Sequence, residues 1–263
     1  MAAYCSRCGE KRRDRTDWKL SRIADETFAE ITNVEHSKLW QTLWLLVFRP
    51  GQLTREYWSG RRKRFLGPVK LYFVFFALSL VLYSIHQPTA IYDVRTLAAA
   101  DSDGFLSRVL DQKAHQRGVP TPQFAQEVSA HWQSYISLSQ LVYPLFVALA
   151  LKLLLLRRGL YFAEHLIFAL HVLAFMFLSF SLLWPFYVLF GVEYSIEHFT
   201  VWAALLTAGS IAWTAVYLLL ALRCAYAEPW LPTVIKSAVV FFVYVITSMF
   251  FLYAALALAI AFT

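Results

Sequence analysis

Charged residues are scarce in this sequence, and long stretches lack them almost completely. Asp, Glu, Lys and Arg make up 16% of the 263 residues, whereas about a quarter is usual for a soluble domain. The stretches with no such residue, or with a single lysine, are 71–85, 135–156, 166–192, 199–222 and 237–263. A helix of roughly 20 apolar residues crosses a bilayer core and satisfies its own backbone polar groups there, so the pattern predicts membrane-spanning helices.

We therefore expect an all-α fold, a polytopic membrane helix bundle with about five transmembrane helices. The expected spans are 68–86, 136–156, 164–190, 199–222 and 237–262. Three parts are expected along the chain: a cytoplasmic N-terminal segment at 1–35, an interfacial helical hairpin at 36–67, and the bundle at 68–263. Within the bundle, residues 87–134 have the apolar spacing of two short amphipathic helices outside the membrane.

Cysteine is also rare, which excludes a disulfide framework of the kind found in small secreted domains. Cys5 and Cys8 form a Cys-x-x-Cys-Gly knuckle, which supplies half of the four thiolates of a structural zinc site. His36, Cys224 or a second protomer could complete such a site, and the alternative is a degenerate knuckle without metal. Zinc is the only cofactor that the sequence suggests.

Several sequence motifs that would name a reaction are missing. There is no Gly-x-Ser-x-Gly elbow, no phosphate-binding glycine-rich loop and no dinucleotide fingerprint. The basic charge lies next to the expected spans, so nucleic acid is not an expected partner. Whether the protein is an enzyme is left open by these absences.

Lys and Arg are distributed unevenly between the segments that join the spans. Residues 1–70 contain 15 Lys or Arg against 8 Asp or Glu, whereas residues 87–134 contain 4 against 5. The other basic segments are 152–158 and 223–236, and residues 191–198 carry acids only. Because cations accumulate on the cytoplasmic side, this alternation predicts a cytoplasmic N-terminus and a C-terminus outside.

The segment ahead of the first span has the pattern of a helical hairpin. Residues 36–48, "HSKLWQTLWLLVF", have apolar residues at helical spacing but are too short to cross a bilayer. Pro50-Gly51 interrupts the pattern, a second short helix fits 52–59, and Pro68 begins the first span. Trp40 and Trp44 favour the headgroup level of a membrane, so we expect the first helix to lie in the inner interface or to pack on the bundle.

Four consecutive cations, Arg61, Arg62, Lys63 and Arg64, directly precede the first span. A cation next to an anionic leaflet gains about 1 kcal/mol, so with Trp40 and Trp44 these residues form a candidate site for anionic lipid headgroups. The alternative is that the four cations only orient the span.

The knuckle, the segment "RPGQLTREYWSGRRKRFLGPVKLY" and the apolar span that follows resemble a bacterial family of polytopic membrane proteins catalogued as a domain of unknown function. The positions that carry the resemblance are Pro50, Gly51, Tyr57, Gly60, Arg61, Arg62, Pro68 and Tyr72. The later segment "YFAEHLIFALH" is also similar. Family members often have two knuckles, and this chain has one. The resemblance implies a multi-pass protein of the bacterial inner membrane and supplies no activity.

Ionisable residues inside the third expected span are the weak candidates for catalysis. Glu164 and His171 are seven residues apart and share a helix face, and His165 follows Glu164. They could relay protons, bind a cation or serve an active site. The structural alternative pairs Glu164 with Arg157 or Arg158 and gives His171 a hydroxyl partner on a neighbouring helix.

The leading functional hypothesis is a non-catalytic membrane protein that binds lipid or a partner through the basic hairpin, or moves a small lipid-like solute. One alternative is a membrane enzyme that acts on a lipid or isoprenoid substrate. Another is a proton-coupled transporter that uses Glu164 and His171. A protein partner or a homo-oligomer is compatible with each.

Overall fold

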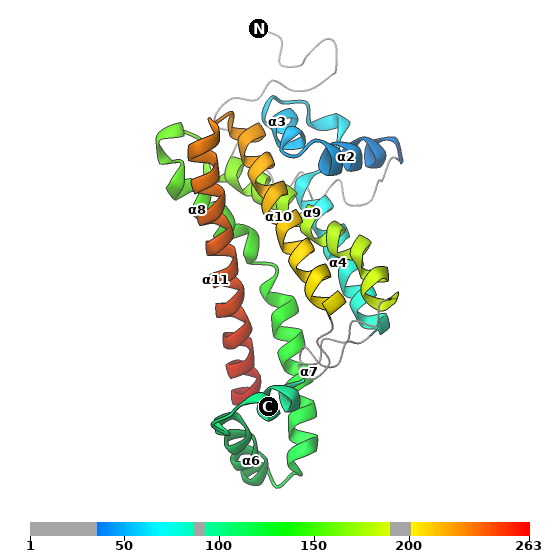
Figure 1. Ribbon diagram of the computed structural model, residues 1–263, viewed down its shortest axis with the longest axis vertical. Coiled ribbons are helices and arrows are strands. Elements are labelled where there is room, and N and C mark those ends of the chain that lie inside the picture. Colours follow the sequence, from blue (N-terminus) through cyan, green and yellow to red (C-terminus); the bar gives the residue numbers. More distant parts are fainter. Residues whose placement is uncertain (1–35, 87–92, 190–200) are drawn as a thin grey trace. The chain divides into compact units, whose positions relative to one another are not determined.

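The computed structural model describes residues 36–86, 93–189 and 201–263, and over these residues it is all-helical (Figure 1). The expected all-α class is confirmed. Four helices are long and apolar enough to cross a membrane: α4 (Pro68–His86), α9 (Phe162–Leu189), α10 (Val201–Tyr226) and α11 (Trp230–Phe262). By helix length and hydropathy the chain is therefore a multi-pass membrane protein.

The second expected span, 136–156, is not a single helix in the structure. Helix α7 (Thr121–Ser139) ends before that span is complete, and α8 (Tyr143–Leu154) begins after a short break. Pro144 lies in the first turn of α8, where its missing N–H costs no helical hydrogen bond, and it disfavours a helix that continues from the preceding turn. The two helices pass the span criteria together, so the described residues hold four candidate spans, or five if this pair is one span.

By its residue contacts, the chain divides into two compact units. Unit 1 consists of Met1–Leu82, Pro144–Leu183 and Ser210–Val243. Unit 2 consists of Tyr83–Tyr143, Trp184–Gly209 and Tyr244–Thr263.

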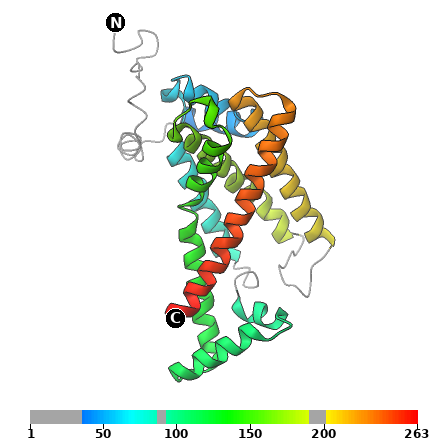
Figure 2. The same ribbon diagram turned by 90° about the vertical axis from the view of Figure 1, so that its left-hand side faces the viewer.

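Unit 1 begins, in its described part, with the helical hairpin. It comprises α2 (His36–Phe48), α3 (Gln52–Trp58) and the short 3-10 helix η2 (Arg62–Arg64), which leads into α4. The buried Thr42 closes the hairpin, because its hydroxyl accepts the backbone N–H of Leu66 at 3.0 Å and donates to the Lys38 carbonyl at 2.6 Å. Figures 1 and 2 show α2 and α3 at the end of unit 1 where α10 ends and α4 begins.

The hairpin is packed closely on α9 and α10. Gly51 has φ +79°, and a Cβ built on it would lie 2.3 Å from the carbonyl oxygen of Ala221 in α10. The buried hydroxyl of Tyr217 donates to the Leu46 carbonyl at 2.8 Å, and its ring stacks on Phe175 of α9. These contacts fix the hairpin to the bundle of its own unit.

Two connections between long helices meet at the same end of unit 1. The 3-10 helix η3 (Leu156–Arg158) precedes α9, and Glu228 lies between α10 and α11. Glu228 accepts hydrogen bonds from Arg158 at 2.9 Å and from Lys236 at 2.6 Å. The Glu228 carboxylate thus joins η3, ahead of α9, to the start of α11.

Unit 2 has a hydrophobic core of its own. Its helices include α5 (Val94–Ala100), α6 (Phe105–Arg117), α7 and the C-terminal part of α11. The core residues are Val94, Leu110, Ala114, Phe124, Ala125, Val128, Trp132, Ala255 and Ala259. The indole N–H of Trp132 donates to the Leu252 carbonyl at 3.0 Å. The sequence pattern indicated α6 and the start of α7, whereas α5, which Asp93 caps, was not expected.

Candidate functional site

The exposed face of α2 is a row of large aromatic side chains. Trp40, Trp44 and Phe48 are 71%, 59% and 61% exposed, and they follow one another at four-residue spacing along one face of the helix. The other side of α2 is buried, with Leu46 and Thr42 inside the unit. The structure thus places both predicted tryptophans at the surface.

A groove of about 820 Å³ lies beside this aromatic row. Its charged lining residues are Glu56 and Arg64, and most of the rest are apolar. The lining residues come from α2, α3, the end of η2 with Phe65, and α9: Trp40, Gln41, Leu43, Trp44, Leu45, Val47, Phe48, Glu56, Arg64, Phe65, Leu178 and Leu182. A long apolar wall with a cation at its edge suits an amphiphilic molecule.

The predicted cations differ in their contacts. Arg61 forms an ion pair with Glu56, and this hydrogen bond holds the pKa of the Glu56 carboxyl below its ordinary value. Arg62 lies over the Tyr57 ring at 5.1 Å and donates to the Tyr57 carbonyl. Arg64 lines the groove. A 3-10 helix turns about 120° per residue, so consecutive side chains in η2 point in different directions.

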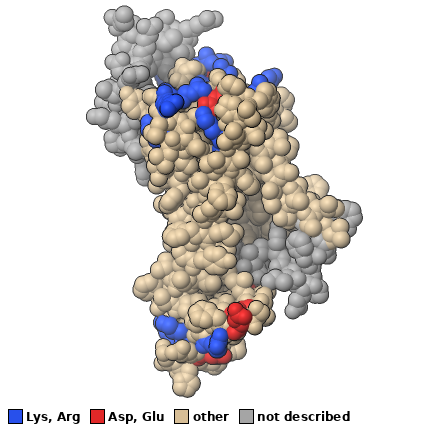
Figure 3. Space-filling view, turned by 60° about the vertical axis from the view of Figure 1, so that its left-hand side comes forward, with Lys and Arg blue, Asp and Glu red and all other residues tan. Residues whose placement is uncertain are grey.

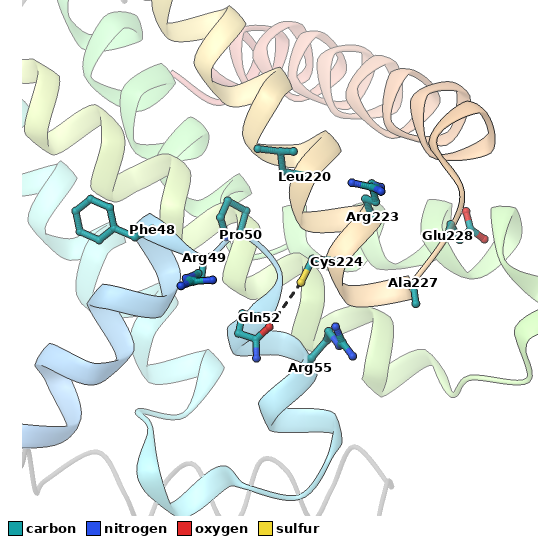
Figure 4. Close-up of a pocket in the computed structure, with 10 residues that line it drawn as sticks. All are labelled: Phe48, Arg49, Pro50, Gln52, Arg55, Leu220, Arg223, Cys224, Ala227 and Glu228. Atoms are coloured by element: carbon teal, nitrogen blue, oxygen red, sulfur yellow. Dashed lines mark hydrogen bonds between the residues drawn. The ribbon is translucent and has the colours of Figure 1, made fainter.

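A second cavity, of about 500 Å³, lies between the hairpin and the end of α10. Arg49, Arg55 and Arg223 contribute three guanidinium groups to its lining (Figure 4). Sequence reasoning missed Arg49 and Arg55 as site residues and counted them only toward topology. The only signal was their position on either side of Pro50-Gly51, the turn that packs on α10.

Figure 3 shows a group of Lys and Arg side chains at one end of the face that it draws, next to a surface of uncharged residues. Arg158 and Lys236 bind Glu228. Burial alone would raise the pKa of Glu228, but hydrogen bonds from Lys236 and Arg158 outweigh it and lower the pKa from its ordinary value. Glu228 is therefore ionised at neutral pH and compensated by two cations.

Glu164, His165 and His171 make three separate contacts. Glu164 accepts the Tyr161 backbone N–H at 2.7 Å at the start of α9. Nδ1 of His165 lies 2.8 Å from the Tyr226 hydroxyl, and Nδ1 of His171 lies 2.9 Å from the Thr54 hydroxyl. Both imidazoles are buried.

His171 thus has the hydroxyl partner that the structural alternative asked for, and that hydroxyl belongs to α3 of the hairpin. Arg158, one of the expected partners of Glu164, pairs with Glu228. The two histidines join α9 to the hairpin and to α10 through Nδ1, whereas Nε2 of each is buried without a hydrogen-bond partner among the described residues.

The predicted metal ligands Cys5 and Cys8 lie outside the described residues. Among the residues that the structure describes, no group of three or more His, Cys, Asp and Glu side chains could hold a metal ion. The thiol of Cys224 lies 3.8 Å from the side-chain oxygen of Gln52. Zinc binding stays a prediction.

Comparison with known proteins identifies one part of the chain. Residues 36–80 match a family model described as "Protein of unknown function (DUF3667)", a range that covers the hairpin and most of α4. The predicted resemblance to a family of unknown function is thereby confirmed. No curated protein and no solved structure matches the chain.

Proposed function

We propose that the DUF3667 domain at residues 36–80 binds a membrane lipid with an anionic headgroup, and that the protein is a non-catalytic lipid-binding component of the bacterial inner membrane. The observation that carries the proposal is the groove beside α2. It combines exposed indoles, an apolar wall on α9 and a cation, Arg64, in one cavity of about 820 Å³.

The chemistry of the groove fits the two ends of a lipid. Trp40 and Trp44 present amphipathic rings of the kind that settle at the headgroup level. Leu178 and Leu182 offer an apolar surface to an acyl chain, and each buried CH₂ contributes about 0.8 kcal/mol. Arg64 supplies a planar set of N–H donors that matches phosphate oxygens.

The charges in the lining favour an anion. Glu56 is the one acidic residue among the described residues that line the groove, and Arg61 pairs with it. Arg61 and Arg64 both act on this carboxylate, so two cations face one acid and a net positive charge is left to act on a headgroup. The basic composition of residues 1–70 supports a cytoplasmic position, where the leaflet is anionic.

Native mass spectrometry of the protein, reconstituted with equal amounts of phosphatidylglycerol and phosphatidylcholine and released gently, tests the proposal. We expect the wild type to retain phosphatidylglycerol preferentially, and the double variant Trp40→Ser/Trp44→Ser and the single variant Arg64→Gln to lose most of that preference. Phe105→Ser is the matched control, because Phe105 is a 66% exposed aromatic residue of α6 in unit 2. Equal retention by all four proteins would contradict the proposal.

A further inference from the structure

We propose that the cavity lined by Arg49, Arg55 and Arg223 is a second binding site, specific for a phosphate monoester or diphosphate group. The three arginines come from separate places in the chain: the turn after α2, the middle of α3 and the last turn of α10. Gln52 and Cys224 lie between them, and Figure 4 shows Arg49 and Arg55 on the hairpin side and Arg223 on the α10 side.

The charge around this cavity is not balanced by acids. Glu228 is the one acidic residue among the described residues that line it, and its side chain is only 7% exposed. Arg158 and Lys236 both bind this carboxylate, so it has little negative charge to offer the cavity. Among the residues that the structure describes, neither Arg49 nor Arg55 has an ion-pair partner.

The guanidinium groups are arranged to receive an anion. Arg223 lies over the ring of Trp230 at 3.6 Å, a stacking contact that holds its plane and leaves the N–H groups at its edge free to donate. Arg49 and Arg55 line the cavity and are exposed. Three cations that line one cavity favour an anion with two or more negative charges.

The backbone that carries two of these arginines is fixed before any ligand arrives. Gly51 lies so close to the carbonyl of Ala221 that the turn between Arg49 and Arg55 cannot move away from α10 without losing this packing. The contact between Gln52 and Cys224 adds a second point of attachment. A preorganised site loses less entropy when the ligand binds.

The size of the cavity and the type of cation define the ligand chemistry. A volume of about 500 Å³ falls in the usual range for small-molecule sites and exceeds what one phosphate ion fills. Arginine forms paired N–H···O bonds with phosphate, and three arginines match a dianionic monoester or a diphosphate better than a singly charged diester. The phosphate group belongs either to a lipid with a terminal phosphate or to a soluble phosphate compound.

This site goes beyond the lipid groove proposed above, because its three arginines do not line that groove. Phe48 lines both cavities. The variants Trp40→Ser/Trp44→Ser, which remove the groove's indoles, must therefore leave phosphate binding unchanged, so the two proposals can fail separately.

Calorimetric titration of the full-length protein in detergent with inorganic pyrophosphate tests the site. We expect saturable binding to the wild type and at least a tenfold weaker affinity for Arg55→Gln/Arg223→Gln, with affinity falling as NaCl is raised. Arg117→Gln in α6 of unit 2 is the matched control and should bind as the wild type does.

A second measurement uses the unaltered protein, in case the double variant does not fold. Pyrophosphate should protect Arg49, Arg55 and Arg223 from modification by phenylglyoxal, read residue by residue by mass spectrometry, and should not protect Arg117. In parallel, nanodiscs with phosphatidic acid, a monoester, are compared with nanodiscs with phosphatidylglycerol, a diester.

Binding of pyrophosphate in detergent supports a soluble phosphate compound as the ligand. Arginine-dependent retention of phosphatidic acid without pyrophosphate binding supports a lipid with a terminal phosphate. Either result upholds the site. Absence of both, or binding that is equal in Arg55→Gln/Arg223→Gln and the wild type, would overturn it.

Discussion

At the scale of single residues, Gly51 and Gly60 have different roles in the hairpin. Both glycines have positive φ, +79° and +90°. A side chain on Gly60 would meet nothing within 4 Å, whereas one on Gly51 would meet the backbone of Ala221. Gly60 is therefore needed for its backbone angle, and Gly51 for its angle and for close packing on α10.

Replacing each glycine by alanine separates these two requirements. Gly60→Ala should cost about 1–2 kcal/mol for the left-handed backbone alone. Gly51→Ala should cost that amount and roughly 1–3 kcal/mol more, because the backbone of α10 must shift. Thermal unfolding in the same detergent measures the difference, and equal melting temperatures of the two variants would show that the hairpin does not pack on Ala221.

The hydrogen-bond partners of the α9 histidines could be predicted only in part from the sequence. An imidazole inside an apolar helix needs a polar partner, so a hydroxyl bonded to His171 could be foreseen. The identity of that hydroxyl could not, because Thr54 is 117 residues away in the chain. Arg49, Arg55 and Arg223 were missed for the same reason: only the fold brings them to one cavity.

At the scale of elements, helical periodicity predicted some helices well. Residues 36–48 form α2 as expected, and Pro68 begins α4. The pattern did not indicate that Thr42 would be buried, because its partner, the N–H of Leu66, is presented by the turn after η2. Hydropathy also predicted one helix over 136–156 where the chain has α7, a break and α8, because apolar composition does not register that Pro144 has no N–H to bond a carbonyl of the preceding turn.

Glu228 connects two elements that hydropathy treats as unrelated, η3 and the start of α11. Because its pKa is lowered in the folded protein, its contribution to stability is complete above the ordinary value of 4.5 and is lost as pH falls below it. We expect Glu228→Gln to melt at a lower temperature than the wild type at pH 7, and the gap to close toward pH 3.

The control for this pH series is Glu127→Gln, which removes an exposed glutamate of α7 in unit 2. Melting temperatures measured from pH 7 to pH 3 in one detergent make the comparison. If Glu228→Gln kept the full pH dependence of the wild type, the carboxylate would not be what joins the two connections.

At the scale of the whole chain, contacts inside unit 1 help to determine how many times the chain crosses the membrane. Trp58 of the hairpin lies 5.1 Å from the ring of Tyr226 at the end of α10, and His165 near the start of α9 bonds to the same tyrosine. The hairpin and the start of α9 are thus at one end of the unit. Helix α4 has 19 residues and leads away from that end over about 28 Å. The chain must therefore return between α4 and α9.

Among the described residues of that stretch, only α7 and α8 together are long and apolar enough to make the return. If this pair crosses, the chain has five crossings, the number that the alternation of Lys and Arg along the sequence predicts. On this topology, residue 157 lies on the cytoplasmic side and residue 111 lies outside.

Single cysteines at these two positions test the crossing. In a variant with Cys5, Cys8 and Cys224 changed to Ser, we expect Asp111→Cys to react with a membrane-impermeant maleimide in intact cells, and Arg157→Cys to react only after permeabilisation. The cysteine-free parent shows the background. If the bent pair of helices did not cross, both positions would lie on one side of the membrane and would label alike, and α10 and α11 would then run in directions opposite to those that the cations predict.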